Sequence, residues 1–231
     1  MPHRQLKTGT VPERSRPLWL YLLALFAILI VMQGALRKWI FPGLSTPLYV
    51  LKDAVLLGGV GLFFLNQNFR LPPAMRKTAL PLLWGGLAWI VGVQAFNINM
   101  PSVLVSILGI RSYLLYTVLL VMMPVALEYV ERPRRLVNFI GLGVIVLVLL
   151  LGVYQFSMPA GHWINQYASQ GSHVAKMGDS ARISGTFSYI GGMDSFLTFS
   201  LGFSTSVFVA GIRWMKRWYQ VLPLQTIQMV V

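Results

Sequence analysis

The sequence contains no cysteine and only six acidic residues among 231. Without cysteine the protein can form neither a disulfide nor a cysteine-ligated metal site. Charged residues make up 11% of the chain and hydrophobic residues 56%, whereas about 25% of the residues in a soluble domain are charged. The sequence also lacks a P-loop, a glycine-rich dinucleotide motif and an Asp-x-Asp pair for a metal-bound nucleotide sugar. These properties indicate an all-α, polytopic membrane helix bundle.

The net charge of +13 lies in short clusters at the ends of apolar runs. This pattern is typical of membrane helices and argues against binding to nucleic acid. The segments between the apolar runs fall into two alternating sets, with 13 and 5 Lys and Arg residues. The positive-inside rule therefore predicts a cytoplasmic N-terminus and an external loop at residues 157–189.

Six apolar segments are each close to the roughly 20 residues that a helix needs to cross the hydrocarbon core. They cover residues 18–36, 47–65, 79–96, 113–130, 136–156 and 192–212, and a seventh begins near Tyr219. We therefore divide the chain into a basic cytoplasmic tail at 1–17, five transmembrane helices with short loops at 18–156, a long periplasmic loop at 157–189, and a last part at 190–231 that holds the sixth helix, a cytoplasmic loop and the start of the seventh.

The loop at 157–189 is the only long polar segment between apolar runs, and such loops are usually functional or disordered. It closes with the motif Arg182-Ile183-Ser184-Gly185-Thr186-Phe187. A guanidinium is always charged and can bind a phosphate through two hydrogen bonds, so Arg182 is a candidate ligand for an anion. The alternative is a solvated loop arginine. His173 is the candidate general base, although its spacing supports neither this role nor a metal site.

Three further charged residues lie in or beside apolar segments. Lys52 and Asp53 are adjacent in the second segment, and charges at membrane depth are often functional. Alternatively, Lys52 extends outward and Asp53 pairs with an arginine on a neighbouring helix. Arg111 precedes the fourth segment. The residues just before it, 101–110, are apolar, and we expect them to form a short helix or a re-entrant turn at the membrane surface. Arg111 can bind an anionic headgroup or substrate, or it can anchor the helix at the membrane interface.

The motif at 182–187, at the junction of a loop and a helix, resembles the start of the conserved domain of O-antigen ligases and Wzy-type polysaccharide polymerases. Three earlier stretches resemble the N-terminal half of bacterial exopolysaccharide polymerases in the same superfamily. They are Gly34-Ala35-Leu36-Arg37-Lys38-Trp39, Leu51-Lys52-Asp53 and Gly109-Ile110-Arg111-Ser112-Tyr113. The resemblance extends from about residue 34 to 212. It implies a GT-C-like glycosyltransferase of the bacterial inner membrane that uses a polyprenyl-diphosphate-linked glycan on the periplasmic side.

The resemblance also implies roles for individual residues. Arg182 would be the main contact of the donor diphosphate, with Arg111 and Arg37 as secondary contacts. These cations would stabilise the departing diphosphate without a metal or another cofactor. Members of the family have further spans and a later outer loop with essential Arg and His residues. We therefore expect this chain to correspond to the N-terminal half of such an enzyme and to be inactive alone, with the general base in the other half unless it is His173.

The expected partners are the lipid-linked glycan, membrane lipids and other polysaccharide export proteins. A second hypothesis is a non-enzymatic protein, either a transporter or an assembly subunit of a polysaccharide export complex. Transporters often contain inverted repeats and broken helices. The sequence shows neither feature, but half of a repeat protein would hide both, so this alternative stays open.

Overall fold

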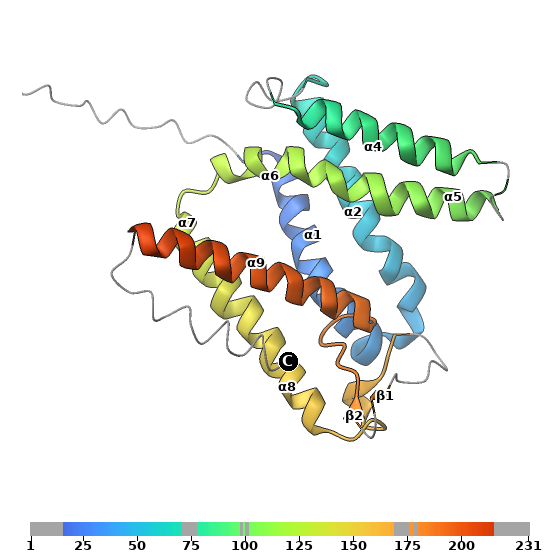
Figure 1. Ribbon diagram of the computed structural model, residues 1–231, viewed down its shortest axis with the longest axis vertical. Coiled ribbons are helices and arrows are strands. Elements are labelled where there is room, and N and C mark those ends of the chain that lie inside the picture. Colours follow the sequence, from blue (N-terminus) through green and yellow to red (C-terminus); the bar gives the residue numbers. More distant parts are fainter. Residues whose placement is uncertain are drawn as a thin grey trace, which may run out of the picture.

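The computed structural model describes residues 16–70, 78–97, 99, 102–168, 176–177 and 180–214 (Figure 1). Helices dominate these ranges, which confirms the all-α prediction. Within them, five helical segments are long and apolar enough to cross a membrane, and they cover Leu18–Ile40, Pro42–Asn66, Val103–Glu128, Pro133–Ser157 and Ile190–Ala210. The protein is therefore a multi-pass membrane protein.

The first two spans form a helical hairpin. α1 (Leu18–Ala35) continues through a π-helical turn, η1 (Leu36–Ile40). A short 3-10 turn, η2 (Pro42–Leu44), then leads directly into α2 (Ser45–Asn66). The two helices pack against each other (Figure 1). The tight connection places the end of α1 and the start of α2 at the same end of the molecule.

The third predicted segment is α4 (Leu80–Ala95), which has 16 residues and is shorter than the five spans. The fourth span begins at Val103 and not at the predicted residue 113. The short helix predicted within 101–110 is present at Val103–Ile110, but it continues directly into the span. Ser102 explains the early start, because its side chain caps the helix by accepting a hydrogen bond of 3.3 Å from the Val105 amide. The span is built from α5 (Val103–Ile110), η3 (Arg111–Leu115), η4 (Tyr116–Val118) and α6 (Leu119–Glu128).

The fifth predicted segment consists of α7 (Pro133–Asn138), η5 (Phe139–Ile145) and α8 (Val146–Ser157), and the sixth is α9 (Ile190–Trp214). Between them the chain forms a 3-10 turn, η6 (Trp163–Asn165), and a small antiparallel pair of strands, β1 (Lys176–Met177) and β2 (Ser180–Ala181). All six predicted apolar segments are thus helical. The predicted seventh, beginning near Tyr219, lies outside the described residues.

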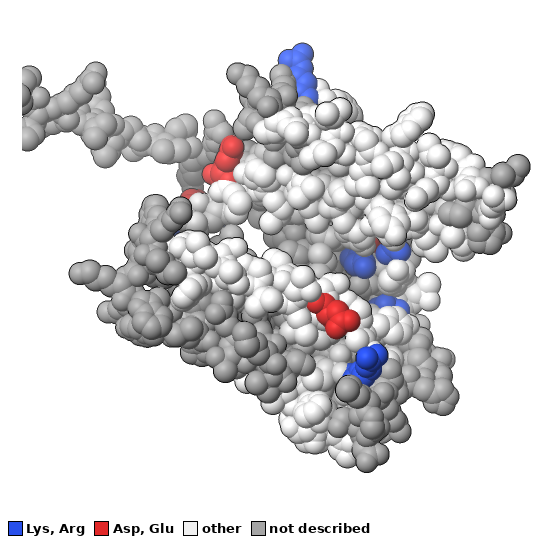
Figure 2. Space-filling view, viewed as in Figure 1, with Lys and Arg blue, Asp and Glu red and all other residues white. Residues whose placement is uncertain are grey.

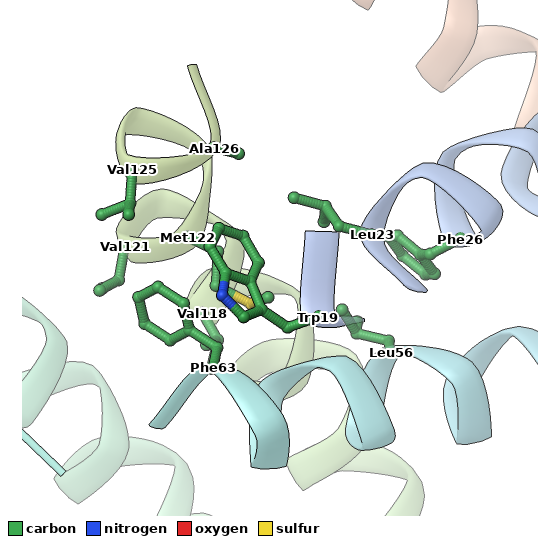
Figure 3. Packing of buried hydrophobic residues seen from close by; sticks show 10 residues of the cluster. All are labelled: Trp19, Leu23, Phe26, Leu56, Phe63, Val118, Val121, Met122, Val125 and Ala126. Atoms are coloured by element: carbon green, nitrogen blue, oxygen red, sulfur yellow. The ribbon is translucent and has the colours of Figure 1, made fainter. Parts of the chain in front are cut away.

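Two apolar cores hold the helices together. In the first, Trp19 of α1, Phe63 of α2 and Met122 of α6 point toward one another (Figure 3). The Trp19 and Phe63 rings meet edge to face, with their centres 5.1 Å apart. Contacts of this kind add to the energy of ring burial. This core fixes the relative positions of the three spans that carry most of the charged residues described below.

The second core joins α8 and α9 to the end of the long loop. Phe187 is buried there among Val148, Leu149 and Phe196. The closing motif of the loop is therefore part of the packed interior. The ends of α1 and α8 and the starts of α2 and α9 gather around this loop (Figure 1).

Candidate anion-binding site

A close contact between α1 and the end of the loop defines one side of the site. Gly34 lies against the backbone of Thr186, Phe187 and Ser188, and a Cβ at this position would overlap all three. Only glycine allows two backbones to approach so closely. Two sequence stretches that carried the family resemblance, 34–39 and 182–187, therefore touch in the folded protein.

Lys38 reinforces this contact from the π-helical turn η1. Its ammonium donates to the Gly185 carbonyl at 2.6 Å and to the Ser184 hydroxyl at 3.1 Å. The residue is only 5% exposed, and its ammonium lies 4.6 Å from the centre of the Trp39 ring. No carboxylate in the described part of the chain pairs with it. Lys38 thus holds the motif to α1 through neutral partners, with no carboxylate partner among the described residues.

Gln155 satisfies the backbone of the same motif from α8. Its Oε1 accepts from the Gly185 amide at 2.8 Å, and its Nε2 donates to the Ile164 carbonyl at 2.8 Å. The side chain is 1% exposed, so water cannot replace it. Gly185 itself has a φ of +55°, a conformation that side-chain-bearing residues rarely adopt. The conformation of the motif is therefore fixed by α1 on one side and by α8 on the other.

Arg37 is the second buried cation of η1, with 8% of its surface exposed. Its Nε donates to the Ser45 hydroxyl at 3.0 Å and its Nη1 to the Ser188 hydroxyl at 2.8 Å. The guanidinium also lies over the Tyr49 ring, 5.2 Å from its centre. Like Lys38, Arg37 has only neutral hydrogen-bond partners among the described residues. Both residues lie in a π-helical turn, and such turns occur frequently at functional sites.

Asp53 and Arg111 form an ion pair between α2 and the fourth span, with 2.5 Å between Oδ2 and Nη2. This confirms the hypothesis that Asp53 pairs with an arginine of a neighbouring helix. The Tyr116 hydroxyl donates to the other carboxylate oxygen at 2.6 Å. Arg111 Nη1 donates to the Tyr49 hydroxyl at 2.9 Å. Arg111 lies inside the fourth span, in η3, and not before it as predicted.

Three cations meet at Tyr49, because Lys52 also lies over its ring, with Nζ 5.1 Å from the centre. We call Arg37, Tyr49, Lys52, Asp53 and Arg111 the tyrosine-centred cluster. Its three cations and single carboxylate leave two positive charges. The face of the tyrosine ring attracts each cation, which offsets part of the repulsion among the three. Figure 2 shows Lys and Arg side chains in the hollow between α5 and the loop before α9.

Of the predicted site residues, the structure brings Arg37 and Arg111 together at Tyr49. The Arg182 side chain is exposed and makes no hydrogen bond or ion pair with the residues that the structure describes. Its carbonyl accepts from the Tyr167 hydroxyl at 3.3 Å. Arg182 therefore stays a predicted ligand. His173 lies outside the described residues.

Tyr49 was not predicted from the sequence, and Lys38 was given no role of its own beyond the charge count and the resembling stretch 34–39. A signal for Tyr49 was present, because it precedes Lys52 and Asp53 by three and four residues. Residues at these spacings share one face of a helix. No local pattern marks Ser188, which contacts Arg37 across 151 positions in the chain.

The fold and the site together define a multi-pass helical membrane protein with a partly buried cationic cluster at one end of its bundle. Comparisons with models of known protein families, with curated proteins and with solved structures found no match. The function of the protein must therefore follow from the chemistry of the cluster and from the motifs that meet there.

Proposed function

We propose that this protein acts in a glycosyltransferase of the bacterial inner membrane that polymerises or ligates polyprenyl-diphosphate-linked glycan, as O-antigen or exopolysaccharide, on the periplasmic face. In this proposal the tyrosine-centred cluster binds the donor diphosphate. The observation that carries it is that Arg37 and Lys52 meet at Tyr49 and that neither forms an ion pair with a carboxylate of the described residues. Uncompensated cations away from water are costly, and a bound anion offsets that cost.

The chemistry of the cluster suits a diphosphate. Guanidinium groups bind phosphate oxygens bidentately, and the Lys52 ammonium adds a point charge. Preorganised cations of this kind can stabilise the charge that develops on a departing diphosphate. Arg182, exposed at the start of the motif, is the third proposed arginine and would approach the ligand from the loop. The general base stays unassigned, with His173 as the candidate from sequence.

The meeting of the four motif stretches at one place supports the proposal. Gly34 and Lys38 contact the motif at 182–187, while Asp53 pairs with Arg111 in the stretch at 109–113. Tyr49 connects these two contacts, because both Arg37 and Arg111 lie over its ring. Stretches that resemble one family thus converge on one cluster. A GT-C-like bundle, with α4 as a sixth span and a seventh from near Tyr219, is part of the same proposal.

The proposed orientation places the cluster toward the periplasm. We expect reporter fusions after Gln67 and after Ser172 to report opposite compartments, with the Ser172 fusion outside. The reason is the excess of Lys and Arg in the segments on the side of Gln67. Alkaline phosphatase and green fluorescent protein fused at each position provide the measurement. The same compartment for both fusions, or Gln67 outside, would contradict the topology.

The proposed ligand can be tested by binding, without relying on activity of this chain. We expect the protein in nanodiscs of neutral lipid to bind farnesyl diphosphate, and Arg37→Gln to weaken binding by about 10- to 100-fold. A charge-assisted hydrogen bond contributes about 1.5–3 kcal/mol, and each 1.4 kcal/mol corresponds to a factor of ten. Microscale thermophoresis with a labelled protein gives the dissociation constants. Arg182→Ala, measured alongside, tests whether the loop arginine belongs to the same site.

The matched control is Arg16→Gln. Arg16 forms an exposed ion pair with Glu131 just before α1, whereas Tyr49 lies beyond the other end of α1, near the start of α2. Loss of Arg16 should therefore leave binding unchanged. Inorganic diphosphate and anionic phospholipid, added as competitors, distinguish a site for an isoprenoid diphosphate from a site for free phosphate or a lipid headgroup. Equal affinities of Arg37→Gln and the unmodified protein would remove the main support for the proposed function.

A further inference from the structure

Asp53 is the only buried acidic residue in the described part of the chain. Glu128, Glu131 and Asp194 are exposed there, whereas Asp53 is 6% exposed. It lies inside the tyrosine-centred cluster, and its carboxylate is held by Arg111 and by the Tyr116 hydroxyl. An anion site that contains a fixed carboxylate binds anions less tightly than the same site without it. The position of Asp53 therefore calls for an explanation beyond packing.

The reaction that we propose for the site changes the charge of the ligand. A glycan linked through a diphosphate diester carries two negative charges. When the acceptor hydroxyl oxygen bonds to the anomeric carbon, the bond from that carbon to the diphosphate oxygen breaks. The electron pair stays on the diphosphate, and the hydroxyl proton is released. The departing polyprenyl diphosphate then carries a third negative charge.

We infer that Asp53 is the residue that sets the charge preference of the cluster, so that the diphosphate diester donor is favoured over the polyprenyl diphosphate that leaves. This inference rests on the proposed function. Arg37, Lys52 and Arg111 supply three positive charges, and Asp53 reduces the net charge to two. The cluster thus matches the two charges of the donor. The third negative charge of the product is repelled by the Asp53 carboxylate, and this repulsion promotes release of the polyprenyl diphosphate.

The hydrogen bonds of Asp53 suit this role. The Tyr116 hydroxyl and Arg111 bind different carboxylate oxygens, at 2.6 Å and 2.5 Å. These two contacts, from one neighbouring span, keep the negative charge in place. A phosphate that contacts Lys52 or Arg111 would lie within roughly 6–8 Å of the Asp53 carboxylate. At that distance one additional charge changes affinity about 30- to 100-fold at an effective dielectric constant near 20. Asp53 acts through the field of the cluster, so it is a specificity residue and not a catalytic one.

The experiment compares two probes on variants whose cluster charge differs. The probes are farnesyl diphosphate, with three negative charges, and its diester with N-acetylglucosamine, with two. The measured quantity is the ratio of their dissociation constants in nanodiscs of neutral lipid. Asp53→Asn raises the cluster charge to three, and Lys52→Gln lowers it to one. Asp53→Asn combined with Arg111→Gln restores a charge of two.

We expect Asp53→Asn to shift the ratio about 30- to 100-fold toward farnesyl diphosphate, which corresponds to the loss of one unfavourable charge interaction. Lys52→Gln should shift the ratio the other way, and the double variant should return it to the value of the unmodified protein. Because Lys52 is half-buried and contacts only two rings, Lys52→Gln provides the test if Asp53→Asn does not fold. A ratio that does not follow the cluster charge would overturn the role of Asp53. Failure of both probes to bind the unmodified protein would instead refute the proposed function.

Discussion

Replacing Gly34 with valine is expected to lower the free energy of unfolding by about 3 kcal/mol or more. A side chain at this position overlaps the backbone of residues 186–188, and backbone cannot move aside as the end of a flexible side chain can. Overpacking of a tight contact costs about 1–3 kcal/mol and occasionally more. The change also draws Lys38 away from Ser184 and Gly185. The measurement is the thermal or denaturant-induced unfolding of the purified protein in detergent micelles.

The matched control is Gly61→Val in α2. Gly61 is also a glycine of a membrane helix, but nothing lies within 4 Å of a Cβ built there. Its replacement should change stability by only a few tenths of a kcal/mol, because valine and glycine differ modestly in helix propensity. Equal stabilities of the two variants would show that α1 and the motif do not touch as described.

The second large effect is expected for Gln155→Leu, which should destabilise the protein by about 2–4 kcal/mol. Leucine fills a similar volume but leaves the Gly185 amide and the Ile164 carbonyl without partners. Each buried, unsatisfied backbone group costs about 1–3 kcal/mol. Unfolding measurements in detergent give the loss of stability. Hydrogen exchange at the Gly185 amide, expected to accelerate, shows where the loss arises.

The control for this change is Ser157→Ala, less than one helical turn further along α8. The Ser157 hydroxyl donates to the Val153 carbonyl on an exposed part of the helix, so water or lipid headgroups can replace it. Its loss should be close to neutral. If Gln155→Leu were as stable as Ser157→Ala, the motif would not depend on α8 for its conformation.

The presence of the helices was predicted from the sequence more accurately than the residues at which they begin and end. Each apolar run was long enough to span a membrane, and a spanning segment must satisfy its backbone internally, so helices were expected. The start of the fourth span was misplaced because Arg111 looked like a boundary. Inside the fold its charge is paired with Asp53, and the helix continues through it. A charged residue inside an apolar run therefore need not mark the end of a helix.

The parts of the candidate site that could be predicted are those that depend on the charge of a single residue or on residues close together in the sequence. A buried carboxylate needs a counter-charge. It could therefore be predicted that Asp53 pairs with an arginine, but the sequence does not show which arginine this is. The contact of Arg37 with Ser188 could not be predicted, because it depends on how the loop returns to α1. The partners of Lys38 could not be predicted either, since among the described residues they are a hydroxyl and a backbone carbonyl of the distant loop.

The distance along the chain between Arg37 and Ser188 has a consequence for biosynthesis. The two residues are separated by 151 positions, and ribosomes add about 5–20 residues per second. Arg37 therefore enters the membrane roughly 8–30 seconds before its partner is made. The interval between the synthesis of Lys38 and that of its partner Ser184 is almost as long, because 146 positions separate them. During that interval both cations need temporary partners, such as lipid headgroup phosphates or the insertion machinery, and the anion site is among the last parts of the described fold to assemble.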